Sequence, residues 1–151
     1  MTLPKDPYSN QDASRDTPSR QKLVRLRETL LKLHKTMLHM ERRDYEKMHG
    51  KVNAGELFRL VVDDPQFAWL HSLSEFVVEI DEALASEKGV TEEDASSSIS
   101  LARKLFLPSE TGDAFQKKYF EAIQRDPAVV MDHAELVRLF GQEPKEADGE
   151  Q

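Results

Sequence analysis

The chain contains no cysteine, and it is poor in the residues that interrupt helices. Its 151 residues include six glycines and seven prolines. Without cysteine there is no disulfide framework and no thiol chemistry, which suits a reducing cytosol and predicts a cytoplasmic protein. The scarcity of glycine and proline argues against a fold rich in strands or loops.

Long hydrophobic runs are also missing. No apolar run approaches the roughly 20 residues that a helix needs to cross a bilayer, and the N-terminal residues have no hydrophobic segment typical of a secretory signal. We therefore expect no membrane association. The net charge of −7 argues against a nucleic-acid partner, because nucleic acids carry the same sign of charge.

The charge is unevenly distributed along the chain. Residues 20–43 carry eight basic residues against two glutamates. The simplest interpretation is a basic helix packed beside acidic neighbours in the same fold. The alternative is a basic surface for RNA, DNA or anionic lipid, formed by Arg20, Lys22, Arg25, Arg27, Lys32, Lys35, Arg42 and Arg43.

Apolar residues recur at helical spacing over most of the chain. Leu23, Leu26, Leu30, Leu33 and Met37 follow one another at intervals of three and four, which predicts a long helix over 19–49. Met48 is expected on the same inward stripe. Further helices are expected to begin near Ala54, Pro65, Thr91, Gly112 and Asp132, where capping residues precede periodic segments.

This pattern predicts an all-α protein, an antiparallel bundle of about four to five helices with disordered termini. No strand alternation and no internal repeat is visible. The helical domain is expected over 19–140. Residues 1–18 are rich in proline and polar residues and 141–151 are acidic, so we expect both segments to be disordered tails.

One short motif invites a metal hypothesis. Glu46-Lys47-Met48-His49 has the Glu-x-x-His spacing of helical di-iron sites. On a helical wheel that places Leu30 at 0°, however, Glu46 falls near 160°, on the solvent side. The second such motif that a di-metal site needs is missing. We therefore expect neither a metal site nor a cofactor.

Other polar residues fall on the buried side. On the same wheel Glu41 lies at about 20°, His34 at about 40° and Tyr45 at about 60°. Ser74 and Asp81 flank the buried face of the helix after Pro65. A buried carboxylate needs a partner, so we expect Arg103 to pair with Glu41 and Asp81 to orient the His34 ring.

Three interpretations of His34, Glu41, Tyr45, Ser74, Asp81 and Arg103 stay open from the sequence. They can form a structural network that sets helix register. They can line a small-molecule or acid–base pocket inside the bundle. They can also supply ligands to a single metal ion or a haem.

The run LHKTMLHMERRDYEKMHG, with LVVDDPQFAWLHSLSEFVVEIDEAL after it, resembles a family of small uncharacterised bacterial proteins. The family pattern is L-H-K-x-L, E-R-x-x-Y-E, D-P-x-F-x-W-L-x-x-L-S and D-E. The resemblance implies a bacterial, all-helical protein and no known activity. It covers roughly 33–84, with matches at His34, Glu41, Arg42, Tyr45, Glu46, Asp64, Pro65, Phe67, Trp69, Leu70, Ser74, Asp81 and Glu82.

The leading functional prediction is a small helical protein that acts by binding, as a homodimer or as an adaptor for a protein partner. It is not expected to be an enzyme. The second hypothesis is a ligand-binding or acid–base site built on His34, Glu41, Tyr45 and Asp81. The third is a nucleic-acid binder that uses the basic residues of 20–43.

Overall fold

The structure is a computed structural model that describes residues 17–141, and every regular element in that range is a helix. The all-α prediction is therefore confirmed, but the expected number of helices is too low. The predicted tails, 1–18 and 141–151, lie outside the described residues except at their inner ends. The seven described helices are α2 (Pro18–His49), α3 (Ala54–Asp63), α4 (Pro65–Ala68), α5 (His71–Ala85), α6 (Glu92–Leu105), α7 (Ala114–Arg125) and α8 (Pro127–Gly141).

Two helix boundaries differ from the sequence prediction. The segment after Asp64 is not one helix, because the chain breaks between α4 and α5 at Trp69 and Leu70. α8 begins at Pro127 rather than after Asp132, since Asp126 caps it by accepting the Ala128 N–H over 2.9 Å. Asp132 consequently lies inside α8, where it is buried.

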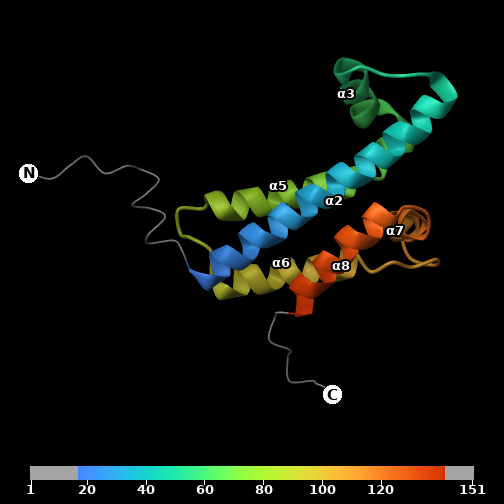
Figure 1. Ribbon diagram of the computed structural model, residues 1–151. Coiled ribbons are helices and arrows are strands. Elements are labelled where there is room, and N and C mark those ends of the chain that lie inside the picture. Colours follow the sequence, from blue (N-terminus) through green and yellow to red (C-terminus); the bar gives the residue numbers. More distant parts are fainter. Residues whose placement is uncertain (1–16, 142–151) are drawn as a thin grey trace, which may run out of the picture.

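α2 is the central helix, and α5, α6 and α8 pack along it (Figure 1). The predicted stripe of Leu23, Leu26, Leu30, Leu33 and Met37 is fully buried, which confirms the inward face of α2. Burying a side chain of this size contributes about 1.5–3 kcal/mol. The position of α2 between the other helices therefore follows directly from its apolar spacing.

Aromatic rings fill the part of the core between α6 and α7. Phe106 meets Phe115 edge to face at 5.3 Å, and it meets Tyr119 in the same way at 5.3 Å. Trp69 adds a tilted contact with Phe115 at 5.5 Å. Such ring pairs are worth about 0.5–1.5 kcal/mol beyond the area they bury. The contact of Trp69 with Phe115 connects the break between α4 and α5 to α7.

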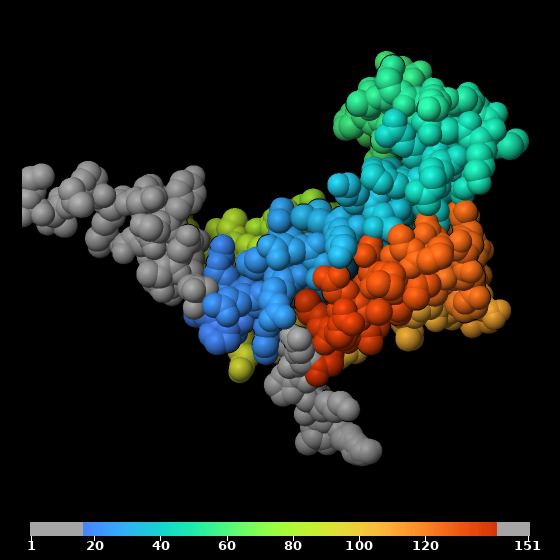
Figure 2. Space-filling model, viewed as in Figure 1, coloured from blue at the N-terminus to red at the C-terminus, as the bar shows by residue number. Residues whose placement is uncertain are grey.

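The C-terminal part of α2 extends beyond the packed helices and carries α3 with it (Figures 1 and 2). Met48 was predicted to face the core, but its side chain is 81% exposed. The helical spacing continues at this residue, yet no neighbouring helix reaches that far along α2. α3 itself has no buried residue, and its packing partner is α4. We call residues 42–63 the α3 arm.

Candidate functional site

The six predicted site residues do not form one cluster. Glu41 is buried, His34, Tyr45, Ser74 and Asp81 are half-buried, and Arg103 is exposed. Among them the structure brings together one pair, His34 and Ser74, whose Nε2 and Oγ atoms lie 3.1 Å apart. The predicted pairs Arg103–Glu41 and Asp81–His34 are not formed, because Arg103, Glu41 and Asp81 have other partners.

Glu41 occupies the core position that the helical wheel assigned to it, with 5% exposure. Its carboxylate accepts hydrogen bonds from Gln66 Nε2 over 3.0 Å and from Trp69 Nε1 over 2.8 Å. The guanidinium of Arg125 approaches to 4.0 Å. The predicted partner Arg103 instead donates to the carbonyl of Phe140 over 2.8 Å. Glu41 is therefore held by Gln66 of α4, by Trp69 directly after α4 and by Arg125 of α7.

His34 is half-buried, and its ring contacts the hydroxyl of Ser74. Burial lowers the pKa of His34, which favours the neutral imidazole. Asp81, predicted to orient this ring, instead forms an ion pair with Arg27 two turns earlier on α2. Since Asp81 meets a residue seven positions before His34, its place along α2 is displaced by about two turns from the predicted one.

Tyr45 belongs to the α3 arm rather than to the polar core. Its ring stacks on His49 at a centroid distance of 4.1 Å and meets Phe67 at 6.1 Å. His49 is exposed. The contacts to the Tyr45 ring are thus ring-to-ring packing contacts.

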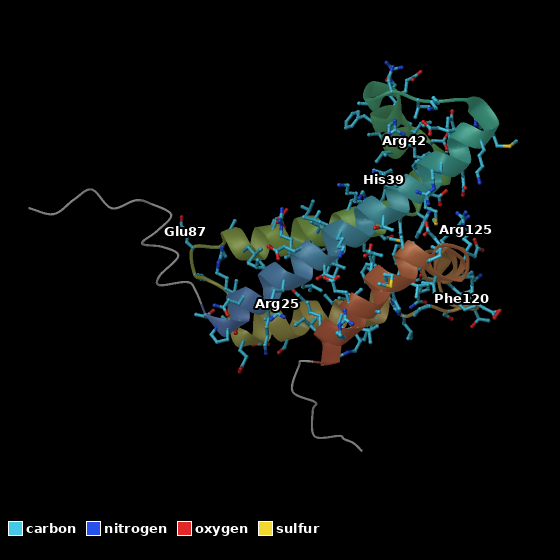
Figure 3. All side chains as sticks on the ribbon, in the orientation of Figure 1. Arg25, His39, Arg42, Glu87, Phe120 and Arg125 are labelled. Atoms are coloured by element: carbon cyan, nitrogen blue, oxygen red, sulfur yellow. The ribbon has the colours of Figure 1, made fainter. Side chains whose placement is uncertain are left out.

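Two residues near the end of α2 hold the loop that connects α2 to α3. The Glu46 carboxylate accepts the Val52 N–H over 3.0 Å, and Arg42 Nη2 donates to the Val52 carbonyl over 2.7 Å. Arg42 and Glu46 also pair with each other at 3.3 Å. The hydrogen bond from Val52, assisted by Arg42, lowers the pKa of Glu46. Figure 3 shows Arg42 where α2 passes beneath α3.

The loop between α2 and α3 is shaped by its own sequence. Gly50 adopts a φ of 84°, in the left-handed region that glycine enters at little cost. Asn53 then begins α3 with a capping box in which Glu56 is the reciprocal partner. At the other end of the helix, His71 Nε2 donates to the Val61 carbonyl over 2.7 Å. The arm is therefore anchored at both ends.

The α3 arm exposes large apolar side chains. Phe58 is 69% exposed and Val62 is 50% exposed, and they lie one turn apart on the same side of α3. Leu57, Leu60 and Val61 are half-buried. α3 therefore leaves two large apolar side chains in solvent on one side.

The Glu46-x-x-His49 motif is used differently from the metal hypothesis. Glu46 accepts a hydrogen bond from the loop between α2 and α3, and His49 Nδ1 lies 3.2 Å from the Tyr45 carbonyl. Within residues 17–141 no group of three or more histidine, aspartate or glutamate side chains is placed to hold a metal ion.

A groove of about 300 Å³ lies between α2 and α8. None of the six predicted site residues reaches it. Lys32 and Glu135 form an ion pair of 3.1 Å on its wall. Its lining is charged and mixed in sign, and consists of Arg25, Glu28, Thr29, Lys32, Glu135, Arg138 and Leu139.

Sequence reasoning missed a second polar pair, formed by the buried Tyr119 and the half-buried His133. The Tyr119 hydroxyl lies 2.7 Å from His133 Nδ1. Burial raises the pKa of Tyr119 and lowers the pKa of His133, so both groups are neutral at pH 7. A helix that begins at Asp132, as the sequence predicts, sets His133 in its first turn and gives the residue no inward direction. Recognising Asp126-Pro127 as the start of α8 would have turned His133 inward.

No protein-family model, no curated protein and no solved structure matches this chain. No helix within residues 17–141 is both long and apolar enough to span a bilayer.

Proposed function

We propose that this chain is a non-enzymatic binding protein whose α3 arm inserts into an apolar groove of a partner protein. The observation that carries the proposal is the exposure of Phe58, at 69%, on a helix with no buried residue. Amphipathic helices are recognised in this way when anchors one turn apart enter a partner's groove. Phe58 and Val62 are such a pair.

The anchoring of the arm supports this proposal. A helix that is already formed loses less conformational freedom on binding than one that must fold first. The Arg42–Glu46 pair and the Asn53 capping box hold α3 in a fixed place before any partner arrives. The charges beside the anchors, Glu56, Arg59 and Asp63, are mixed in sign, which favours recognition by apolar contact.

Affinity capture with matched variants tests the proposal. Wild-type protein, Phe58→Asp and the control Val78→Asp, which alters a similarly exposed residue on α5, are each used as bait in extract from the native host. The retained protein is then purified and its affinity is measured directly. We expect Val78→Asp to match wild type and Phe58→Asp to bind at least about tenfold more weakly. A purified partner that binds all three equally would contradict the proposal.

The acid–base alternative is less well supported because both carboxylate oxygens of its central residue already accept a side-chain hydrogen bond and the residue is buried. Glu41 already receives Gln66 and Trp69, and Asp81 is paired with Arg27. A catalytic carboxylate needs access to a substrate proton at hydrogen-bond distance. The buried network is better suited to fixing helix register, as one of the sequence interpretations proposed.

The antiparallel bundle, the bacterial origin and the cytoplasmic location form part of the same proposal. The contacts Arg20–Leu84, His34–Ser74 and Glu41–Trp69 support opposite directions for α2 and α5, because the partner number falls as the α2 number rises. The family resemblance supports a bacterial source. The absence of cysteine supports a reducing compartment.

A further inference from the structure

The outer side of α8 carries almost no charge. Val130, Met131 and Val137 are 43%, 70% and 47% exposed, and Ala134 is exposed between them. Val130, Ala134 and Val137 follow at intervals of four and three residues, so they line one side of the helix. Figure 2 shows α8 at the surface of the molecule, beside α2. Two charged residues flank this stripe: Arg138, which is exposed, and Glu135, whose side chain is 42% exposed and pairs with Lys32. The residues that α8 exposes are Pro127, Ala128, Val130, Met131, Ala134, Val137, Arg138 and Gly141.

This side of α8 differs from the outer faces of the other helices. Each of the other helices of ten residues or more within residues 17–141 exposes at least three charged side chains. α5, for example, exposes Glu75, Glu79 and Glu82 around Val78. A surface helix normally buries an apolar stripe and leaves charged residues outside, whereas a helix apolar on both sides is usually covered on both. α8 already buries Val129 and Leu136 on its inner side.

We propose that the outer stripe of α8 is a homodimer interface that packs against the same stripe of a second copy. A two-fold axis brings identical patches face to face, so any charge in such a patch meets its own sign. Each copy carries a net charge of −7, and the other helices present charges outward. The uncharged stripe of α8 is therefore the surface on which two copies meet with the least repulsion. This proposal is independent of the partner proposed for the α3 arm.

Ala134 gives the stripe a natural crossing point. Helices pack with axes about 8–10 Å apart, and a small residue at the contact allows the closer approach. With Ala134 of both copies at the axis of an antiparallel pair, Met131 of one copy faces Val137 of the other. Arg138 lies at the edge, where its aliphatic stem can pack while the guanidinium stays in water. One helix face is smaller than the roughly 800 Å² per partner of a typical stable complex, so we expect micromolar affinity.

Sedimentation equilibrium of the full chain over a range of concentrations tests the interface. We expect wild-type protein to shift from monomer to dimer in the micromolar range. Ala134→Glu places two carboxylates together at the axis and is expected to weaken the dimer by about 100-fold. Glutamate is a good helix former, and circular dichroism checks that the exposed substitution leaves the fold intact. Val78→Glu adds the same charge on α5 and should dimerise like wild type.

The absence of cysteine allows a second measurement that does not depend on losing an interaction. Ala134→Cys sets one thiol per chain at the proposed axis, within the roughly 4–7 Å between Cα atoms that a disulfide spans. Under mild oxidation it should form covalent dimers faster than Val78→Cys. A wild-type chain that stays monomeric up to about 200 µM overturns the proposal. So does a dimer that survives Ala134→Glu, or equal cross-linking of the two cysteine variants.

Discussion

Trp69 Nε1 donates a hydrogen bond to Glu41 Oε2 over 2.8 Å, joining the break between α4 and α5 to the middle of α2. Gln66 Nε2 donates to the other oxygen of Glu41 over 3.0 Å and also to its backbone carbonyl over 3.1 Å. One buried carboxylate thus accepts hydrogen bonds from Gln66 within α4 and from Trp69 directly after it. The short helix α4 keeps its place on α2 through a polar contact as well as through the burial of Phe67.

We expect Glu41→Leu to destabilise the protein by about 2–4 kcal/mol, because the donors of Gln66 and Trp69 lose their acceptor in a site largely shielded from water. Urea unfolding can be followed by the fluorescence of Trp69, the single tryptophan of the chain. Glu28→Leu, at an exposed position of the same helix, should change the free energy of unfolding by less than about 0.5 kcal/mol. Equal effects of the two substitutions would mean that the Glu41 contacts contribute nothing.

The stability of the fold should fall as the solution is acidified from pH 7 to pH 5, in part because of His34. Burial lowers the pKa of His34 in the folded state, whereas the unfolded chain keeps the ordinary value of about 6.5. Above that pH the contribution of the neutral ring is fully present. Below it the unfolded state binds the proton more readily, so the free energy of unfolding decreases until the folded pKa is reached.

His34→Gln is therefore expected to make the free energy of unfolding less dependent on pH over this range. His133, whose pKa is also lowered by burial, acts in the same direction, so His34→Gln/His133→Gln should flatten the curve further. Urea titrations at several pH values measure the slope. His39→Gln, at an exposed position, should retain the wild-type slope. An unchanged slope in the double variant would contradict the assignment.

Glu46→Ala should loosen the α3 arm without unfolding the bundle. The substitution removes the acceptor for the Val52 N–H and leaves Arg42 without its carboxylate. We expect the backbone amides of α3 to exchange with solvent faster, while those of the buried part of α2 keep their protection. Hydrogen exchange resolved by peptide measures both. Lys47→Ala is the neighbouring control, and matching exchange in the two variants would count against the role given to Glu46.

Truncation of Phe67 in α4 should reduce the stability of the fold far more than truncation of Phe58 in the α3 arm. Phe67 is fully buried, so Phe67→Ala is expected to cost about 3–5 kcal/mol through the lost contacts and the cavity. Phe58 is 69% exposed, and Phe58→Ala should change stability by less than about 0.5 kcal/mol. Denaturant titrations compare them. A large loss of stability at Phe58 would assign that side chain to the core and remove the argument for a binding element.

Helical periodicity was enough to predict much of this fold. The spacing of leucines along α2 predicted its buried stripe, and the same wheel placed Glu41 among them. Thr91 was predicted to cap a helix, and it begins α6 with Asp94 as its reciprocal partner. These features depend on residues within one or two helical turns of each other, which the sequence displays directly.

The partners of the polar residues were not predictable in the same way. They depend on how far one helix slides along another, and no pattern within a single helix shows that displacement. Asp81 was expected beside His34, but it meets Arg27, two turns earlier on α2. The His133 contact was missed for a related reason, since it depends on where α8 begins.

Weak interaction with nucleic acid is the last expectation that the charges support. Four basic residues of α2, Arg27, Lys32, Arg42 and Arg43, form ion pairs with carboxylates of the same chain. Together with a net charge of −7, this leaves few cations for phosphates. We expect the protein to elute from heparin below about 0.15 M salt. Asp81→Asn frees Arg27 and should raise the eluting salt concentration. Tight retention of wild type that Lys35→Ala weakens would restore the nucleic-acid hypothesis.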